Sequence, residues 1–387
     1  MKSKEFLSIV ADAHSRRSWF CSLLPATLLF IAFFLVCSFL APDYKERFTI
    51  EVFSDSLQNL KCKDQCKPNG SELLPEAIVS KTSNLELRPL WGSPEKNEGS
   101  SVNLIAIPVG IGQKDLVNKT VTKFLSSNFV VMLFHYDGNV DEWKSFEWND
   151  NVIHVSAASQ TKWWFAKRFL HPDIVAQYSY IFLWDEDLGV ESFDPERYLS
   201  IVKSEGLEIS QPALDRVKST EVHHQITTRW RGSIVHRRMY SRSCDENSSA
   251  PPCTGWIEMM APVFSRASWR CVWYMIQNDL VHAWGLDMQL GYCAQGDRTK
   301  NVGVVDAEYI IHYGRPTLGG DANKTDVSAD DQSSKRQHST STEILAPSHP
   351  SGHRADVRRQ SYREFNMFKK RWKNAVEEDQ CWVDPFQ

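Results

Sequence analysis

The feature that most restricts the fold is an alternation of short apolar runs with amphipathic segments, which begins at Val102. The runs VNLIAIPVGI (102–111) and FVVMLFHYD (129–137) flank a stretch with helical spacing of its apolar residues, Leu116, Val117, Val121, Phe124 and Leu125. NVIHVS (151–156) and YSYIFLW (178–184) repeat the pattern around the helix-like TKWWFAKRFL (161–170). Continuous apolar runs are typical of parallel strands that are buried on both faces. We therefore predict an α/β fold with its ligand site at the carboxyl ends of the strands.

The segment Trp19–Leu40 contains no charged residue and is long enough to cross a bilayer as a helix. The basic residues before it predict a cytoplasmic N-terminus: Lys2, Lys4, Arg16 and Arg17. We predict a cytoplasmic tail (1–18), one transmembrane signal anchor (19–40) and a lumenal remainder, in the Golgi or another membrane of the secretory pathway. A cleaved signal peptide is the alternative, although such peptides usually have a shorter apolar stretch and end in a small-x-small site.

The polarity and periodicity of the remaining sequence change at several points, which divides it into four predicted regions. Residues 41–98 are polar with little periodicity, which predicts a stem, and 99–318 form the predicted lumenal domain. Within that domain SWRCVWYMIQNDLVHAW (268–284) predicts one amphipathic helix, and VGVVDAEYIIHYG (302–314) predicts a strand or a strand pair. Residues 319–360 predict a disordered insertion or tail, and 361–387 predict a C-terminal helix.

Charge and cysteine content limit the partners and the compartment. Lys+Arg number 44 against 48 Asp+Glu, a net charge of -4, so the chain lacks the basic excess that nucleic-acid binding needs. The cysteines beyond the apolar segment allow up to three disulfides in an oxidising compartment. Cys244 and Cys253, which flank a Pro-rich loop, form the best candidate pair. Cys62-x-x-x-Cys66 lacks the second ligand pair of a structural zinc site, which favours a local disulfide or none.

Three consecutive acids, Asp185, Glu186 and Asp187, follow the apolar strand YSYIFLW. Their mutual repulsion is unfavourable unless a cation lies among them. Alternate residues of a strand share a face, so Asp185 and Asp187 are expected to project together and Glu186 to turn away. Two carboxylates are hard oxygen ligands for Mn²⁺ or Mg²⁺, and such an ion commonly takes substrate phosphates as further ligands. A solvated turn after the strand is the structural alternative.

This D-x-D, placed behind a signal anchor and a stem, resembles the pattern of GT-A glycosyltransferases. The resemblance implies a GT-A-like mixed sheet flanked by helices, a nucleotide-sugar donor and a Mn²⁺ or Mg²⁺ cofactor. It also implies a nucleotide-binding role for Gly110 after the first strand, for Asp137 after the second, and for Lys162 or Lys167 near the diphosphate. His312 in YIIHYG matches the late metal ligand of many such enzymes. Each of these residues has an ordinary structural alternative, such as a turn, a solvated charge or a core histidine.

Two longer stretches are similar to a family of plant membrane proteins of unassigned function, labelled as related to lysine-ketoglutarate reductase trans-splicing. They are IFLWDEDLGVESFDPERYLSIVKSEGLEISQPALD (181–215) and residues 251–319, which begin PPCTGWIEMMAPVF. The label does not support a reductase, because Gly110-x-Gly112 lacks the third glycine of a dinucleotide fingerprint.

The acceptor side of the site is expected around GLDMQLG (285–291). A single acid there, Asp287, is the candidate catalytic base, with an N-cap as its structural alternative. Glu258 in TGWIEMMAPVF is a second acid among apolar residues, either paired in the core or facing substrate. Trp256 is a candidate for stacking on a sugar.

The leading hypothesis is a metal-dependent glycosyltransferase that acts on a glycan or glycoprotein acceptor. The alternative is a non-catalytic GT-A-like membrane protein that binds glycans or acts as a scaffold. A metal-dependent hydrolase is a third class, but no H-E-x-x-H, G-x-S-x-G or Walker loop supports it.

Overall fold

The structure, a computed structural model, describes residues 62, 67–82, 102–220, 225–315 and 351–386, except for the side chains of 351–355. The chain divides into two compact units, Met1–Cys66 and Lys67–Gln387, and the second contains the sheet and its helices. No helix in the described ranges has the length and apolar content of a membrane span. The predicted anchor at Trp19–Leu40 lies outside those ranges.

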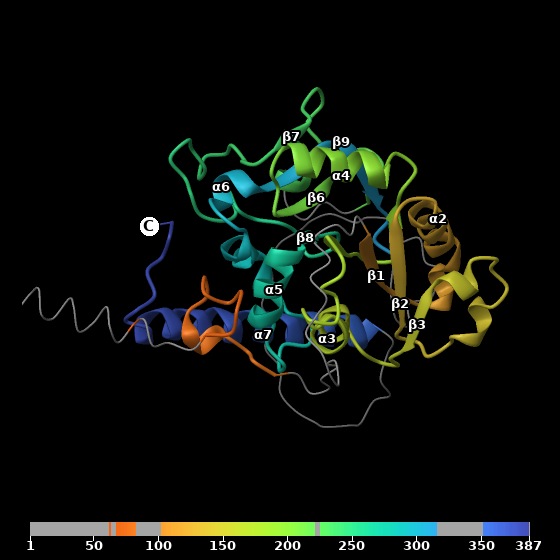
Figure 1. The fold of residues 1–387 in the computed structure, drawn as a ribbon, viewed down its shortest axis with the longest axis horizontal. Helices are drawn as coiled ribbons and strands as arrows, with labels where there is room; N and C mark the ends of the chain where they lie inside the picture. Colours follow the sequence, from red (N-terminus) through yellow and green to blue (C-terminus); the bar gives the residue numbers. More distant parts are fainter. Residues whose placement is uncertain (1–61, 63–66, 83–101, 221–224, 316–350, 387) are drawn as a thin grey trace, which may run out of the picture. The chain divides into compact units, whose positions relative to one another are not determined.

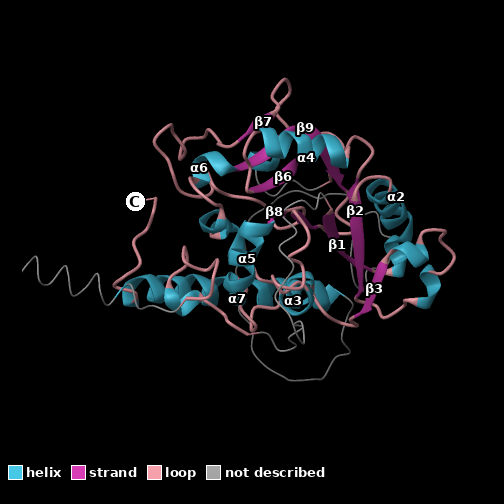
Figure 2. Cartoon of the chain, in the orientation of Figure 1, coloured by secondary structure: helices cyan, strands magenta, loops and turns pink. Residues whose placement is uncertain are grey.

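The second unit is built on a mixed sheet, as the alternating pattern predicted (Figures 1 and 2). The strands run in the order β3, β2, β1, β4, β8, β6, β9, β5, and β7 pairs with β9. Strands β1 to β4 pair in parallel, and β8 is antiparallel to both β4 and β6. The strand bounds are β1 (Asn103–Val109), β2 (Phe129–His135), β3 (Ile153–Ser156), β4 (Tyr180–Leu183), β5 (Leu188–Gly189), β6 (Ile209–Leu214), β7 (Val235–His236), β8 (Val263–Ser265) and β9 (Val302–His312).

Helices cover both faces of the sheet, which explains why the central strands β1 and β4 are largely apolar. The helices are α2 (Lys114–Leu125), α3 (Lys162–Phe169), α4 (Pro195–Ser204), α5 (Arg266–Met275), α6 (Arg298–Asn301) and α7 (Ser351–Glu378). Alternate residues of β1 enter different cores: Leu104 joins the core with α3, α5 and α7, whereas Ile105 joins the core with α2 and α4. Ile181 and Phe182 of β4 divide in the same way. Both faces of β1 and β4 therefore bury side chains, as expected for parallel strands in an α/β fold, whereas the edge strand β3 has no buried residue.

The helix expected over 268–284 is shorter than predicted. Helix α5 starts at the N-cap Ser265, whose hydroxyl accepts a hydrogen bond from the Ser268 amide (3.0 Å), and ends at Met275. Ile276 adopts an extended conformation, and Ala283 has a positive φ of 57°. Beyond α5, Ile276 and Leu280 stay buried whereas Trp284 is 37% exposed, so the three- and four-residue spacing reports partial burial of an irregular segment rather than further helical turns.

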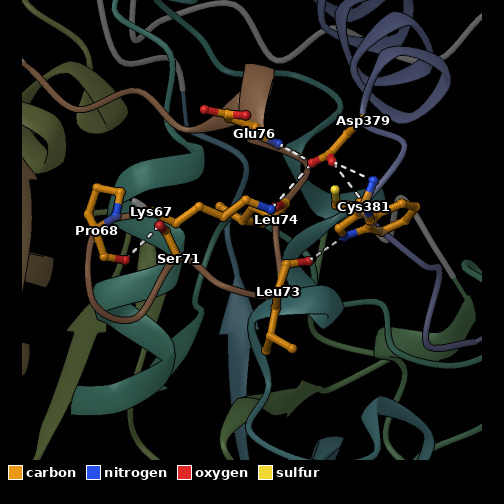
Figure 3. Close-up of polar contacts among 9 residues, drawn as sticks. Lys67, Pro68, Ser71, Leu73, Leu74, Glu76, Asp379 and Cys381 are labelled. Atoms are coloured by element: carbon orange, nitrogen blue, oxygen red, sulfur yellow. Dashed lines mark hydrogen bonds and ion pairs between the residues drawn. The ribbon is translucent and has the colours of Figure 1, made fainter. Parts of the chain in front are cut away.

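Residues 67–82, within the expected stem, belong to the folded unit. Leu74 and Ile78 are fully buried in the core that contains α5 and α7. Asp379, just after α7, holds this segment in place (Figure 3), because its carboxylate accepts hydrogen bonds from the Glu76 amide (2.9 Å) and the Lys67 ammonium (3.3 Å). The indole of Trp382 donates to the carbonyl of Leu73 (2.9 Å). These contacts join two segments about 300 residues apart in sequence.

The C-terminal helix begins earlier than predicted, and the described residues contain a disulfide besides the predicted pair. Helix α7 begins at Ser351, inside the range predicted to be disordered, while 316–350 lie outside the described residues. The predicted pair Cys244–Cys253 is a disulfide. A second disulfide, Cys271–Cys293, joins α5 to the segment before α6 and was not predicted.

Candidate functional site

The candidate site lies where the carboxyl ends of β1, β2 and β4 meet. These strands run parallel, so the loops that follow Val109, His135 and Leu183 leave the same edge of the sheet. The β4 chain continues past its last paired residue, because the Trp184 amide donates to the carbonyl of Ala106 (3.1 Å). The amide of Asp185 donates a hydrogen bond to the backbone carbonyl of Met260 (2.8 Å). The three acids are thereby held between β1 and the segment before β8.

Glu186 turns away from Asp185 and Asp187, as expected for successive residues of an extended chain, and fixes the loops after β1 and β2. Its carboxylate accepts hydrogen bonds from the Gly110 amide (2.7 Å) and the Tyr136 hydroxyl. Burial raises the pKa of the Glu186 carboxyl to about 8. Gly110 is required by this packing, since a Cβ atom there would lie 2.3 Å from the Tyr136 hydroxyl oxygen. The sequence offered Glu186 as an acid but gave no signal of this positioning role.

Asp137 holds the same loop from its other side. One oxygen accepts a hydrogen bond from the Ile111 amide (2.7 Å), and the other accepts one from the Asn139 amide (3.0 Å). Gly110 and Asp137, the two residues expected to approach the nucleotide, are therefore adjacent in space. In this structure the Asp137 carboxylate positions the backbone of the Gly110 loop.

Lys162, the first residue of α3, pairs with Asp185. Its ammonium lies 2.6 Å from Asp185 Oδ1 and also donates to the carbonyl of Met259. Burial raises the pKa of Asp185, and the Lys162 charge opposes that rise. The alternative Lys167 is elsewhere: it is 1% exposed and donates to the carbonyls of Ser80 and Trp273 (both 2.8 Å). Of the two candidate lysines, only Lys162 contacts the acidic triplet.

Asp187 lies beside His312 because β9 ends against β5. Leu188 pairs with His312, and the Tyr313 amide donates to the Asp187 carbonyl (3.1 Å). His312 Nε2 is 3.4 Å from Asp187 Oδ2, the oxygen that also accepts a hydrogen bond from the Arg315 amide (2.9 Å). The fold thus brings together two residues that are 125 positions apart.

The donor atoms of Asp185, Asp187 and His312 suit Mn²⁺ in kind, since two carboxylates and an imidazole are present. In the part of the chain that the structure describes, no group of three or more His, Cys, Asp or Glu side chains is arranged to hold an ion by itself. The 3.4 Å between Asp187 and His312 allows both to reach one ion. The residues therefore fit an ion that takes its other ligands from a bound diphosphate and water.

Glu258 lies close to both halves of the predicted site. Burial raises the pKa of its carboxyl to about 8; Asp185 and Asp287 act in the same direction, and His312 and Lys162 act against it. Among the described residues its Oε2 atom is buried without a hydrogen-bond partner. Asp185, the acid expected on the donor side, and Asp287, the candidate base, therefore both lie near enough to Glu258 to interact with it electrostatically.

The structural alternative for Asp287 and the sugar-stacking role of Trp256 differ from expectation, whereas Asp287 remains the candidate base. Asp287 lies within a 3₁₀ turn, Leu286–Met288, rather than at an N-cap, and its Oδ1 accepts a hydrogen bond from the Met288 amide (3.0 Å). Trp256 is only 1% exposed, so its ring is in the core and not at a surface that a sugar can reach. The run of apolar residues around it is better explained by burial.

Replacing Glu258 by glutamine is expected to stabilise the protein at alkaline pH and to change its stability little in mild acid. The unfolded chain releases this proton near a pKa of 4.5, whereas the folded chain holds it to about 8. The native protein therefore loses stability as the pH rises between these values, and a neutral amide removes that loss. Thermal unfolding at about pH 5 and about pH 9 measures the difference. Glu142→Gln, at an exposed position, is the control, and an equal shift at both pH values would contradict the assignment.

Comparison with solved structures shows distant similarities. S. aureus TarS residues 1–349 match with a TM-score of 0.34 and 8% identity, over 55% of this chain and 60% of that one. The mannosyltransferase Ktr4p from S. cerevisiae matches with a TM-score of 0.22 and 12% identity, over 41% and 53% of the two chains. Its complex with GDP gives a TM-score of 0.21 and 10% identity, over 41% and 54%. The chain thus spans little more than half the length of each.

Family membership follows from the sequence itself. No curated protein matches the chain significantly. The family described as "Protein of unknown function (DUF707)" matches residues 65–378, which include the buried segment before β1, every strand and α7. The chain therefore belongs to this family of proteins of unknown function.

Proposed function

We propose that the protein is a metal-dependent glycosyltransferase of the secretory pathway that transfers a sugar from a nucleotide-sugar donor to a glycan or glycoprotein. The observation that carries the proposal is the pairing of Asp187 with His312, 3.4 Å apart, beside the Asp185–Lys162 ion pair. This arrangement brings two carboxylates, an imidazole and an ammonium group to the carboxyl edge of the sheet. A diphosphate leaving group is anionic, and a site that transfers a sugar from it must stabilise that charge.

The chain's own residues account for the positioning of the donor. Glu186 and Asp137 fix the Gly110 loop, which faces the acidic edge. Lys162 keeps Asp185 oriented and contributes positive charge near the diphosphate. A bound Mn²⁺ would neutralise the charge of the leaving group, with Asp187, His312 and Asp185 as its protein ligands.

The proposed transfer step requires a base for the acceptor hydroxyl. The hydroxyl oxygen forms a bond to the anomeric carbon of the sugar while the bond from that carbon to the diphosphate breaks and its electron pair stays on the diphosphate. The hydroxyl proton passes to Asp287. Asp287, Asp185 and His312 each act on the pKa of the buried Glu258 carboxyl, so all three lie within electrostatic range of that side chain.

A non-catalytic role as a glycan-binding or scaffold protein is the second candidate. It is favoured by the contacts that already satisfy the acids: Lys162 pairs with Asp185, and the Arg315 amide and His312 contact Asp187. A protein with such a site would keep the fold without binding a donor.

The secretory location is supported by sequence and by cysteine chemistry. Trp19–Leu40 is apolar throughout, and disulfides such as Cys244–Cys253 and Cys271–Cys293 persist in oxidising compartments. We propose a single-pass membrane protein with its catalytic unit in the lumen.

Binding of a nucleoside diphosphate separates the two candidates. With Mn²⁺ present, UDP or GDP is expected to raise the unfolding temperature of the purified full-length chain, because a ligand that binds only the native state stabilises it. EDTA is expected to abolish the shift. A screen of nucleotide sugars for donor hydrolysis then identifies the sugar. A folded protein that binds neither nucleotide in Mn²⁺ would favour the scaffold role.

A further inference from the structure

The segment that follows β6 carries a concentration of positive charge that the overall composition hides. Residues 215–243 contain only two acids, Asp215 and Glu221, although the whole chain has a net charge of -4. The cations of this segment are Arg216, Lys218, Arg229, Arg231, Arg237, Arg238 and Arg242. The segment includes β7 and lies against β9, which ends at His312 of the candidate site (Figure 1).

Among the residues that the structure describes, one of these seven cations pairs with a carboxylate. Arg237 pairs with Glu205 (2.8 Å). Arg238 donates to the backbone carbonyls of Asp245 and Ser248, which carry no net charge. In the described parts of the chain no carboxylate pairs with Arg231 or Arg242, and both are exposed. The segment therefore presents a positive field to solvent.

Aromatic side chains are exposed in the same segment. Trp230 is 37% exposed and Tyr240 is 61% exposed, and their ring centroids are 6.4 Å apart. Ile234, 57% exposed, lies in the turn between Trp230 and β7. Large apolar side chains that gather at an exposed position commonly mark a binding surface.

The Trp230 ring packs face to face against His236. It stacks on His236 with centroids 4.3 Å apart and an interplanar angle of 3°. Asp306, a fully buried residue of β9, accepts hydrogen bonds from the Trp230 amide (2.7 Å) and contacts His236 Nδ1 (2.8 Å). His236 Nε2 lies 2.6 Å from the carbonyl oxygen of Ile226. His236 thus covers one face of the indole, Tyr240 lies near the ring at a tilt of 30°, and 37% of Trp230 remains exposed.

We propose that Trp230, Ile234, Tyr240, Arg231 and Arg242, together the Trp230 surface, bind an anionic polysaccharide such as a uronic-acid chain. Flat aromatic faces pack against the C–H faces of sugar rings, and arginines pair with carboxylates through charge-assisted hydrogen bonds. A neutral glycan would make no use of the arginines, and the overall charge of -4 is unsuited to general nucleic-acid binding.

The position of the Trp230 surface suits the acceptor of the proposed transferase, and this part of the inference rests on the proposed function. Asp306 and His312 lie on the same strand six positions apart, hence at most about 20 Å from each other. A chain bound at Trp230 can therefore reach the donor site with its end.

The test uses the full-length chain and polygalacturonate, with neutral dextran as the comparison, at about 0.15 M salt. Binding to polygalacturonate and not to dextran is expected. Arg231→Glu and Tyr240→Ala are each expected to weaken binding at least about fivefold. The matched controls on α7 are Arg363→Glu and Tyr362→Ala; Tyr362 is 59% exposed, close to the value for Tyr240. The controls should bind like the native chain.

The outcomes separate this inference from the proposed function. Both surface variants should keep UDP or GDP binding, and Asp187→Asn should keep polygalacturonate binding. Failure of the native chain to bind UDP or GDP would overturn the proposed transferase function but not the proposed binding role of the Trp230 surface. Equal binding by surface variants and controls would overturn the surface, as would stronger binding to single-stranded DNA or to phosphatidylserine vesicles than to polygalacturonate.

Discussion

The Asp187→Asn variant is expected to reduce kcat/KM for the nucleotide-sugar donor by about 100- to 1,000-fold. Asparagine keeps the shape of the side chain and an oxygen that can accept the hydrogen bond from the Arg315 amide (2.9 Å). It removes the negative charge that faces His312 and that a divalent ion requires. The expected result is therefore a loss of donor turnover with little change in folding. Donor hydrolysis and thermal unfolding of the same preparation measure the two effects.

Glu191→Gln provides the matched control for Asp187→Asn. Glu191 follows the acidic triplet by four residues, but its side chain is 44% exposed and lies 3.7 Å from Lys119 rather than among the candidate ligands. This variant should retain native kcat/KM. An Asp187→Asn protein with undiminished turnover would refute the site, and one that failed to fold would show that the acid is structural.

The Phe124→Ala variant is expected to lower the free energy of unfolding by about 3–5 kcal/mol. Phe124 of α2 is fully buried and packs against Phe129, Phe182, Trp184 and Phe193, with ring centroids 4.8–5.8 Å apart. Truncation leaves a cavity and removes several aromatic contacts at once. Because natural domains are stable by only about 5–15 kcal/mol, the effect is a large fraction of the total.

Denaturant unfolding measures this loss as a lower midpoint with an unchanged slope. Thr122→Ala is the control, since Thr122 lies on the exposed side of the same helix, and it should change stability by less than about 0.5 kcal/mol. Phe182 and Trp184 belong to the chain that delivers the acidic triplet. A Phe124→Ala protein as stable as the control would show that the helix packs differently on the sheet.

The parts of the fold that sequence patterns predicted are those with long apolar runs. β1, β2 and β4 are buried on both faces, and their runs are correspondingly continuous. The helix predicted over 268–284 was too long, because Ile276 and Leu280 beyond Met275 are buried without being helical. Burial determines the spacing of apolar residues, and an irregular segment can satisfy the same spacing.

The residues of the candidate site could be proposed from the sequence, but their contacts with one another could not. Asp185, Asp187 and His312 were selected from strand ends and from a resemblance, and the structure places Asp187 beside His312. The pairing of Lys162 with Asp185 depends on where α3 starts, and the bond from Gly110 to Glu186 depends on strand order. Such long-range contacts have no local sequence signal, and neither does the Cys271–Cys293 disulfide.

The attachment of residues 67–82 by Asp379 has a practical consequence for work with fragments. A fragment starting at residue 99, where the strand pattern begins, would lack Leu74 and Ile78 and would open their fully buried positions to water. It would also leave the Asp379 carboxylate without the Glu76 amide and the Lys67 ammonium. The shortest fragment expected to remain monodisperse therefore begins before Lys67 and retains the chain through Trp382.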